Sequence, residues 1–167
     1  MSLCAVDGSG PWVAMVAAPV LGDVWTAVRG AGAWIARPGE DRRSIRVAPR
    51  VNPSNAIVAV NGWSDRRPPV AQCRALGAAS IELCLVAQGV LDGYVNVAGD
   101  AHGVWDYLAA ALVLLEAGGS IVDAHGRDLV VVDHDLRRSI VGGSTAGLVD
   151  RLVREWARDP TGYRPSD

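Results

Sequence analysis

The sequence predicts a layered α/β fold in which an antiparallel meander packs beside an α/β lobe. In the first 50 residues, five short apolar runs are separated by Gly, Pro and Asp turns, a pattern typical of antiparallel strands. After residue 55, strand-like runs alternate with segments of helical spacing, which indicates an α/β layer. The chain has 167 residues, half of them hydrophobic, so it can bury a sizeable core.

The expected meander occupies residues 1–50. Asp7-Gly8 is a hairpin turn signal between the first two runs. Tryptophans occur in the second, third and fourth runs and are expected to pack the sheet. The segment 49–55 is the best candidate for a boundary between lobes. The five runs are 2–8, 12–18, 23–29, 33–36 and 44–48, and the tryptophans are Trp12, Trp25 and Trp34.

The second expected lobe spans residues 51–159, and residues 160–167 read as a loose tail. Its strands and helices alternate, and glycines stand where the helices should stop. We expect strands at 56–60, 91–97, 120–123, 129–132 and 139–141, a polar loop at 61–69, and helices at 79–88, from Trp105 to Glu116, and at 146–158.

The stretch 103–119 is the most informative part of the chain. It opens with a glycine, closes with Gly118-Gly119, and is apolar enough between them to be a buried helix. Asp106 falls in its first turn, where free N–H groups and the helix dipole favour a carboxylate. A carboxylate on a rigid support at the start of an apolar helix suits a hard-cation ligand. The alternative is that Asp106 is simply an N-cap.

Composition narrows the range of partners. The formal net charge of -2 argues against binding to nucleic acid or to a membrane surface. No apolar run reaches the roughly 18 residues that a membrane span needs. Cys4, Cys73 and Cys84 are an odd number without metal-type spacing, as expected of reduced thiols in a cytoplasmic protein.

Several motifs together resemble the inositol monophosphatase family. They are the run from Arg74 to Gly89 (RALGAASIELCLVAQG), Leu91-Asp92-Gly93-Tyr94, Trp105-Asp106 and Glu116-Ala117-Gly118-Gly119, with Val28 to Trp34 (VRGAGAW) earlier in the chain. They occur in the family's order over nearly the whole chain. The resemblance implies an α+β sugar-phosphatase-like fold and Mg²⁺-dependent hydrolysis of phosphomonoesters, with a small phosphorylated polyol or sugar as substrate.

The resemblance also implies roles for particular residues. Asp106 would be a metal ligand. Gly77, Ala78 and Ala79 would offer backbone N–H groups to substrate oxygens at the start of a helix. Asn96 stands where the family often has a glutamate that contacts sugar hydroxyls. A catalytic role for a histidine is a weaker alternative, with His102 the first candidate because it lies close to Asp106 in the sequence.

Two family features are missing from this sequence: a metal-binding glutamate on an upstream helix and an Asp-Pro-x-Asp-Gly-Thr segment with two further ligands. We therefore expect a truncated or partial chain with little activity of its own. One candidate function is the phosphatase half of such an enzyme. The other is a non-catalytic remnant that dimerises or binds a phosphorylated ligand. A sheet without covering helices would expose an apolar face, so we also expect a homo-oligomer, such as a dimer, formed through residues 1–48.

Overall fold

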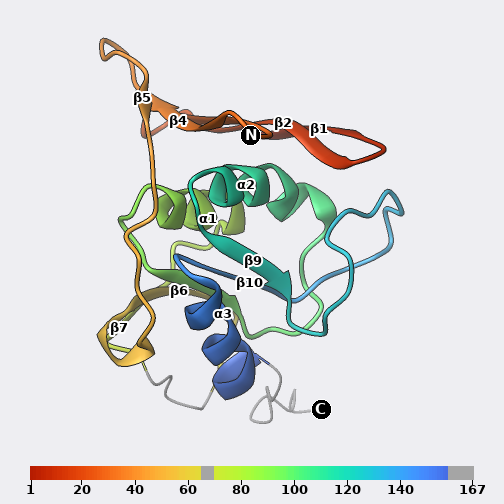
Figure 1. The fold of residues 1–167 in the computed structure, drawn as a ribbon. Helices are drawn as coiled ribbons and strands as arrows, with labels where there is room; N and C mark the ends of the chain where they lie inside the picture. The colour runs from red at the N-terminus through yellow and green to blue at the C-terminus, as the bar shows by residue number, and fades with distance from the viewer. Residues whose placement is uncertain (65–69, 158–167) are drawn as a thin grey trace.

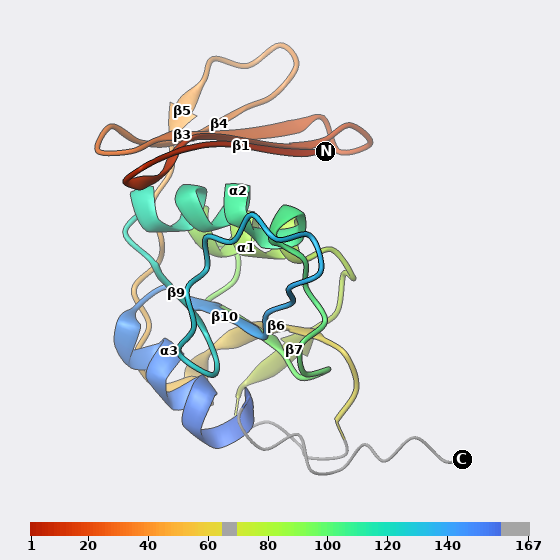
Figure 2. The same ribbon diagram turned by 90° about the vertical axis from the view of Figure 1, so that its right-hand side faces the viewer.

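The computed structural model describes residues 1–64 and 70–157. They form four layers: an antiparallel sheet, a pair of helices, a second sheet, and a C-terminal helix (Figures 1 and 2). The predicted α/β layering is therefore confirmed. The strands of the first sheet precede the segment 49–55, and those of the second sheet follow it. A division of the chain into separate domains at this segment stays a prediction. The expected tail at 160–167 lies outside the described residues.

The first sheet contains five antiparallel strands in sequence order. Its inner face carries a row of small residues, Ala14, Ala27 and Ala33, which lie opposite one another in the register and are buried. Small side chains in this row let helix α2 approach the sheet closely. The strands are β1 (Ser2–Asp7), β2 (Gly10–Ala18), β3 (Asp23–Val28), β4 (Gly32–Ala36) and β5 (Arg43–Ser44).

Helix α2 (Val104–Glu116) packs between the two sheets, beside α1 (Ala79–Ala87) (Figure 2). All eight residues from Tyr107 to Leu114 are buried, so the helix is enclosed on every side over two turns. Gly118 ends it with a positive φ of 89°. At Gly119 a Cβ would lie 2.9 Å from the carbonyl oxygen of Gly143, which explains the second glycine of the pair.

The second sheet has the order β7-β6-β8-β10-β9. Strand β6 runs parallel to β7 and β8, and β10 runs antiparallel to β8 and β9. Helix α3 (Ala146–Leu152) continues into one π-helical turn, Val153–Ala157, on the far side of this sheet. The strands are β6 (Ile57–Asn61), β7 (Gln72–Arg74), β8 (Gly93–Asn96), β9 (Ser120–Asp123) and β10 (Ile140–Gly143).

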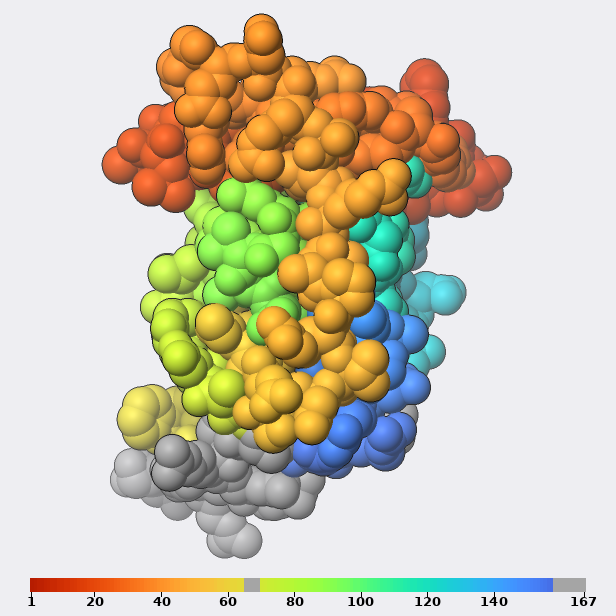
Figure 3. All heavy atoms as spheres, turned by 60° about the vertical axis from the view of Figure 1, so that its left-hand side comes forward, coloured from red at the N-terminus to blue at the C-terminus, as the bar shows by residue number. Residues whose placement is uncertain are grey.

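Two strand predictions were wrong. The run 129–132 is not a strand: it belongs to a long loop in which Leu129 accepts a hydrogen bond from the Tyr107 hydroxyl at 2.7 Å and Val132 is 93% exposed. The predicted strand 44–48 is reduced to a pairing at Arg43–Ser44. Beyond it the chain leaves the sheet and descends toward the second layer (Figure 3), and the N–H of Val47 donates to the carbonyl oxygen of Ala117.

The three tryptophans of the first sheet differ in environment. Trp25 is fully buried, and its indole N–H donates to Gln88 at 2.9 Å. Trp34 points to the outer face, where the guanidinium of Arg42 covers its ring at 4.2 Å. Trp12 is 56% exposed. Only Trp25 joins the core, so the expectation that all three pack the sheet was too broad.

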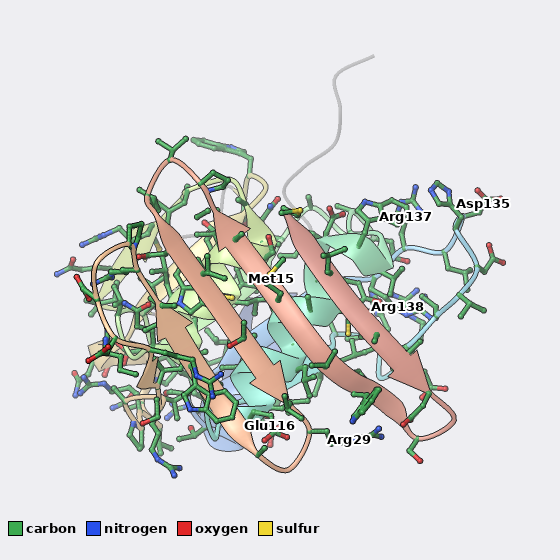
Figure 4. All side chains as sticks on the ribbon, turned by 90° about the horizontal axis from the view of Figure 1, so that it is seen from above. Met15, Arg29, Glu116, Asp135, Arg137 and Arg138 are labelled. Atoms are coloured by element: carbon green, nitrogen blue, oxygen red, sulfur yellow. The ribbon has the colours of Figure 1, made fainter. Side chains whose placement is uncertain are left out.

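Glu116 attaches the first sheet to the end of α2. Its two carboxylate oxygens accept hydrogen bonds from the backbone N–H groups of Gly30 and Gly32, at 2.8 and 2.9 Å. Both glycines lie in or beside the β3–β4 turn, next to Arg29 (Figure 4). A carboxylate suits this position because it can accept from both N–H groups at once.

We predict that Glu116→Ala lowers the free energy of unfolding by about 1–2 kcal/mol, because two N–H groups lose a charged acceptor. Glu116→Gln, which retains one acceptor oxygen, should cost about half as much. Denaturant titration measures both effects. The control is Glu155→Ala, which removes a surface pair with Arg151 and should cost under about 0.5 kcal/mol. Equal losses for Glu116→Ala and Glu155→Ala would contradict the proposed anchor.

Candidate active site

A cavity of about 390 Å³ opens between the start of α1 and the turn that precedes α2. It brings together the sequence-predicted residues Gly77, Ala78, Ala79 and Asp106. The other residues that line it are Asn61, Ser80, Ala101 and His102. Segments distant in sequence therefore meet at one point, beside the two helix starts.

Asp106 contributes both to the start of α2 and to the cavity, although it is not the N-cap that the sequence offered as the alternative. It is the third residue of α2, and its carboxylate accepts a hydrogen bond from the N–H of Gly103, the N-cap residue, at 3.0 Å. This is the carboxylate half of a capping box, so the residue stabilises the helix start without being the N-cap itself. The side chain is also half-buried and lines the cavity. The oxygen that Gly103 does not use leaves capacity for a ligand.

The start of α1 is open toward the cavity. Its N-cap residue, Ala78, has no side chain that can accept from the first turn. Gly77 has a φ of 79°, a left-handed conformation that turns the chain into the helix. The uncapped N–H groups of this first turn are suited to bind ligand oxygens.

Glu82 supports the turn that leads into α1. Its carboxylate is fully buried and accepts a hydrogen bond from the N–H of Leu76 at 2.7 Å. Burial raises the pKa of Glu82, and the N–H groups of Leu76 and Gly77 partly oppose that rise. Gly77 therefore directs its N–H toward Glu82, and the N–H groups that follow it are the better placed to bind ligand oxygens. Sequence reasoning missed Glu82, although a carboxylate inside an apolar helix was a visible signal.

His102 is buried in the cavity wall, where its Nε2 lies 3.0 Å from the hydroxyl of Tyr94. Tyr94 also hydrogen-bonds with Asn61. Burial lowers the pKa of His102, and the charge of Asp106 acts in the opposite direction. Nδ1 of His102 has no hydrogen-bond partner in the described part of the chain. The side chains of His102, Tyr94 and Asn61 form a polar network at the wall of the cavity.

Asn96 does not line this cavity. It lies at the end of β8, beside Asn61 in the parallel register, and is fully buried. Its side-chain amide donates to the carbonyl oxygen of Gly99, and its oxygen accepts from the N–H of Ala98. In this conformation Asn96 stabilises the turn that leads to His102.

A separate charged cluster supports the same loop. Arg127 donates to both Asp100 and Asp123, and the N–H of Ser139 also donates to Asp123, at 2.9 Å. Burial alone would raise the pKa of Asp123, but Arg127 and the backbone N–H groups hold it at about 2. Neither aspartate lines the cavity, so we assign the cluster a structural role.

The cavity fits part of a magnesium site. Asp106 supplies one carboxylate, and the Asn61 amide and Ser80 hydroxyl are the other side-chain oxygens in its lining. Among the described residues, no group of three or more His, Cys, Asp or Glu side chains could hold a metal ion. Among the described residues that line the cavity there is also no Arg or Lys, which disfavours a free anion. A cation would fit this site if residues outside the described lining supplied its remaining ligands.

Three features together define a class of protein. They are the layered fold, the Trp-Asp pair at the start of α2, and the Glu-Ala-Gly-Gly sequence at its end. The chain matches the Inositol monophosphatase family over residues 1–156 and belongs to that family.

Three relatives illustrate the match. The chain is 28% identical to inositol monophosphatase 2 of Solanum lycopersicum, covering 86% of this chain and 55% of the relative. It is 34% identical to a putative Nus factor SuhB of Neisseria meningitidis, covering 69% and 46%. The structure of Mycobacterium tuberculosis SuhB has a TM-score of 0.74 at 26% identity, covering 98% of this chain and 65% of that one. The chain thus spans about half the length of these curated relatives.

In the part of the chain that the structure describes, no helix is both long and apolar enough to cross a membrane.

We predict that Glu82→Gln removes a pH dependence of stability. Because burial raises the pKa of Glu82, the folded state keeps this proton at pH values where the unfolded chain has lost it. The contribution of Glu82 to wild-type stability should therefore fall as the pH rises from the usual glutamate range through its folded-state pKa. The Gln variant, which keeps an acceptor for Leu76, should lack that fall.

The measurement is the free energy of unfolding of both proteins against pH, with the exposed Glu40→Gln as control. The difference between Glu82→Gln and wild type should move in favour of Gln as the pH rises, and by more than the difference between Glu40→Gln and wild type. A constant difference for Glu82→Gln would show that Glu82 does not titrate differently in the folded state.

Proposed function

We propose that this chain is the portion of a Mg²⁺-dependent phosphomonoester hydrolase that carries one metal ligand and the substrate-binding helix start. The substrate class would be a small phosphorylated polyol or sugar. The observation that supports this most directly is that Asp106 and the uncapped first turn of α1 line one cavity. Family membership supports the same chemistry.

Each part of the cavity has a proposed task. The Asp106 carboxylate would contribute one oxygen ligand to the metal. The N–H groups at the start of α1 would bind substrate oxygens, held in place by Glu82 below them. When bound, Mg²⁺ would polarise the phosphate and lower the pKa of an attacking water. For Asn96 to contact a sugar hydroxyl, as the resemblance implies, it would have to release Ala98 or Gly99.

The described residues place one carboxylate in the cavity, so the remaining metal ligands would come from elsewhere, as the resemblance implies. One carboxylate cannot hold Mg²⁺ tightly, because this ion requires near-octahedral oxygen coordination. We therefore expect the chain alone to release phosphate far more slowly than a typical enzyme.

The second candidate is a non-catalytic module that dimerises or binds a phosphorylated ligand. It is favoured by the single carboxylate among the described residues that line the cavity and by the exposed apolar face of the first sheet. For either candidate we propose a cytoplasmic location and no nucleic-acid partner. The absence of disulfides among the three cysteines and the net charge of -2 support this.

The test joins this chain to the upstream half of a full-length relative and measures phosphate release from an inositol or sugar phosphate with Mg²⁺. In an active fusion, Asp106→Asn should lower activity by orders of magnitude because a full negative charge leaves the metal site. Its stability should change by only a few tenths of a kcal/mol, since Asn keeps an oxygen for Gly103.

The control, Asp123→Asn, should behave in the opposite way. It removes a buried charge that Arg127 and Ser139 contact, so it should lower the melting temperature while the folded protein stays active. Equal loss of activity in both variants, or unfolding of Asp106→Asn, would contradict the metal assignment. A folded fusion that releases no phosphate would favour the non-catalytic candidate.

A further inference from the structure

One wall of the cavity carries neutral polar side chains whose hydrogen-bonding capacity the proposed chemistry does not use. Asn61, the last residue of β6, and His102 both line the cavity. Each forms a hydrogen bond with the same atom, the hydroxyl oxygen of Tyr94. Two groups that each lie about 3 Å from one oxygen are at most about 6 Å apart. The two side chains therefore form one continuous polar patch in the cavity wall.

This patch is held rigidly. Tyr94 is fully buried, and its hydroxyl lies 3.0 Å from Nε2 of His102. Gly62, which follows Asn61, has a φ of 94°, and a Cβ on it would lie 2.8 Å from the backbone nitrogen of Ala98. The end of β6 thus packs directly against the turn that follows β8. A polar group fixed in this way loses little conformational freedom when it binds a ligand.

Both side chains keep unused capacity. An asparagine amide has a carbonyl oxygen and an NH₂ group, so a bond to Tyr94 from one of them leaves the other available. Among the described residues, the structure shows no second partner for the Asn61 amide. Nδ1 of His102 is likewise buried without a partner there. A buried polar atom without a partner calls for an explanation, and a ligand in the adjoining cavity supplies one.

The electrostatics of this wall favour a neutral hydroxyl over a phosphate. Burial raises the pKa of Tyr94, and the charges of Glu82 and Asp106 raise it further. Negative charge therefore acts on the patch, and no Arg or Lys among the described lining residues opposes it. A phosphate would be repelled here, whereas a hydroxyl can donate its hydrogen. The two parts of a phosphomonoester would thus separate, with the phosphate at the start of α1 and the alcohol at this wall.

Asn96 is not available for this task, although the resemblance assigns it one of this kind. It is the register neighbour of Asn61 on the adjacent parallel strand. Its amide is bonded to Gly99 and Ala98, and it does not line the cavity. Ligands in α/β sheets bind outside the carboxyl ends of parallel strands, where both asparagines lie. Of the two, Asn61 is the one that faces the cavity.

We propose that Asn61, positioned by Tyr94 and with His102 beside it, binds a hydroxyl group on the alcohol part of the substrate. The site would thereby select polyol phosphates over phosphates of simple alcohols. This inference rests on the proposed function, which places the phosphate at the start of α1. A hydroxyl both donates and accepts, which suits an amide next to an imidazole. An ester without that hydroxyl would leave the polar groups of the patch unpaired, and this is the source of the selectivity.

The test compares glycerol 1-phosphate with propyl phosphate, two esters with the same carbon chain that differ by two hydroxyl groups. Each is titrated into the ¹⁵N-labelled full chain with Mg²⁺, and the dissociation constant is read from the amide shifts at the start of α1. Wild type should bind glycerol 1-phosphate about 10-fold more tightly, the effect of one or two neutral hydrogen bonds. The side-chain NH₂ signal of Asn61 should shift with glycerol 1-phosphate and not with propyl phosphate.

Asn61→Leu keeps the size of the side chain and removes its amide. It should bring the two dissociation constants within about twofold of each other while leaving that of propyl phosphate unchanged. Tyr94→Phe removes the hydroxyl that holds Asn61, and should reduce the preference to about 3-fold. The matched control is Asn55→Leu at an exposed position, which should retain the full preference.

Equal binding of the two esters by wild type would overturn the proposal, as would the absence of binding at tens of millimolar or a preference that persists in Asn61→Leu. Asp106→Asn tests the proposed function separately. It should weaken the binding of both esters to the same extent and keep the preference between them. If Asp106→Asn binds both esters as wild type does, the metal assignment is wrong while the hydroxyl subsite stands.

Discussion

The enclosure of α2 between two sheets is the constraint on which the rest of this structure depends. The helix is buried over its middle two turns, so each sheet must place an apolar face against it. The polar contacts of the helix lie at its two ends. At the start, the Asp106 carboxylate accepts a hydrogen bond from the N–H of Gly103. At the end, the Glu116 carboxylate accepts hydrogen bonds from two N–H groups in or beside the β3–β4 turn. Thirteen residues at about 1.5 Å each form a rigid rod of roughly 20 Å between these anchors. The position of the site carboxylate is therefore coupled to the docking of the first sheet.

The sequence predicted the elements whose ends are fixed by local chemistry. Glycines at 89 and 118 placed the ends of α1 and α2 within a residue or two, because a left-handed turn after a helix favours glycine. The run 129–132 was misassigned because apolar β-branched residues also occur in loops, and pairing with a neighbouring strand depends on tertiary structure. The shortened β5 has the same cause, since Val47 pairs with Ala117 of a distant helix end.

The candidate site was predictable only in part. Asp106 was a candidate from its place in the first turn of a helix as well as from the family resemblance, whereas residues 77–79 came from the resemblance alone. The cavity does bring them together. Asn61, Glu82 and Tyr94 were not predicted, because their roles arise from burial and from contacts between separate elements. The outer face of the first sheet lies on the side of β1–β4 opposite α2, whereas the cavity lies at the starts of α1 and α2.

The central proposal is that Asp106 supplies one ligand to a cation at the shared start of α1 and α2, a site that the chain alone holds only weakly. Paramagnetic broadening by Mn²⁺ in ¹⁵N-resolved spectra of the full chain tests it directly, because Mn²⁺ takes the same oxygen ligands as Mg²⁺. The account predicts that the amides of Gly77, Ser80 and Gly103 broaden first, and that Asp106→Asn abolishes the effect. Broadening centred on Asp100 and Asp123, or broadening at the helix starts that persists in Asp106→Asn, would contradict it.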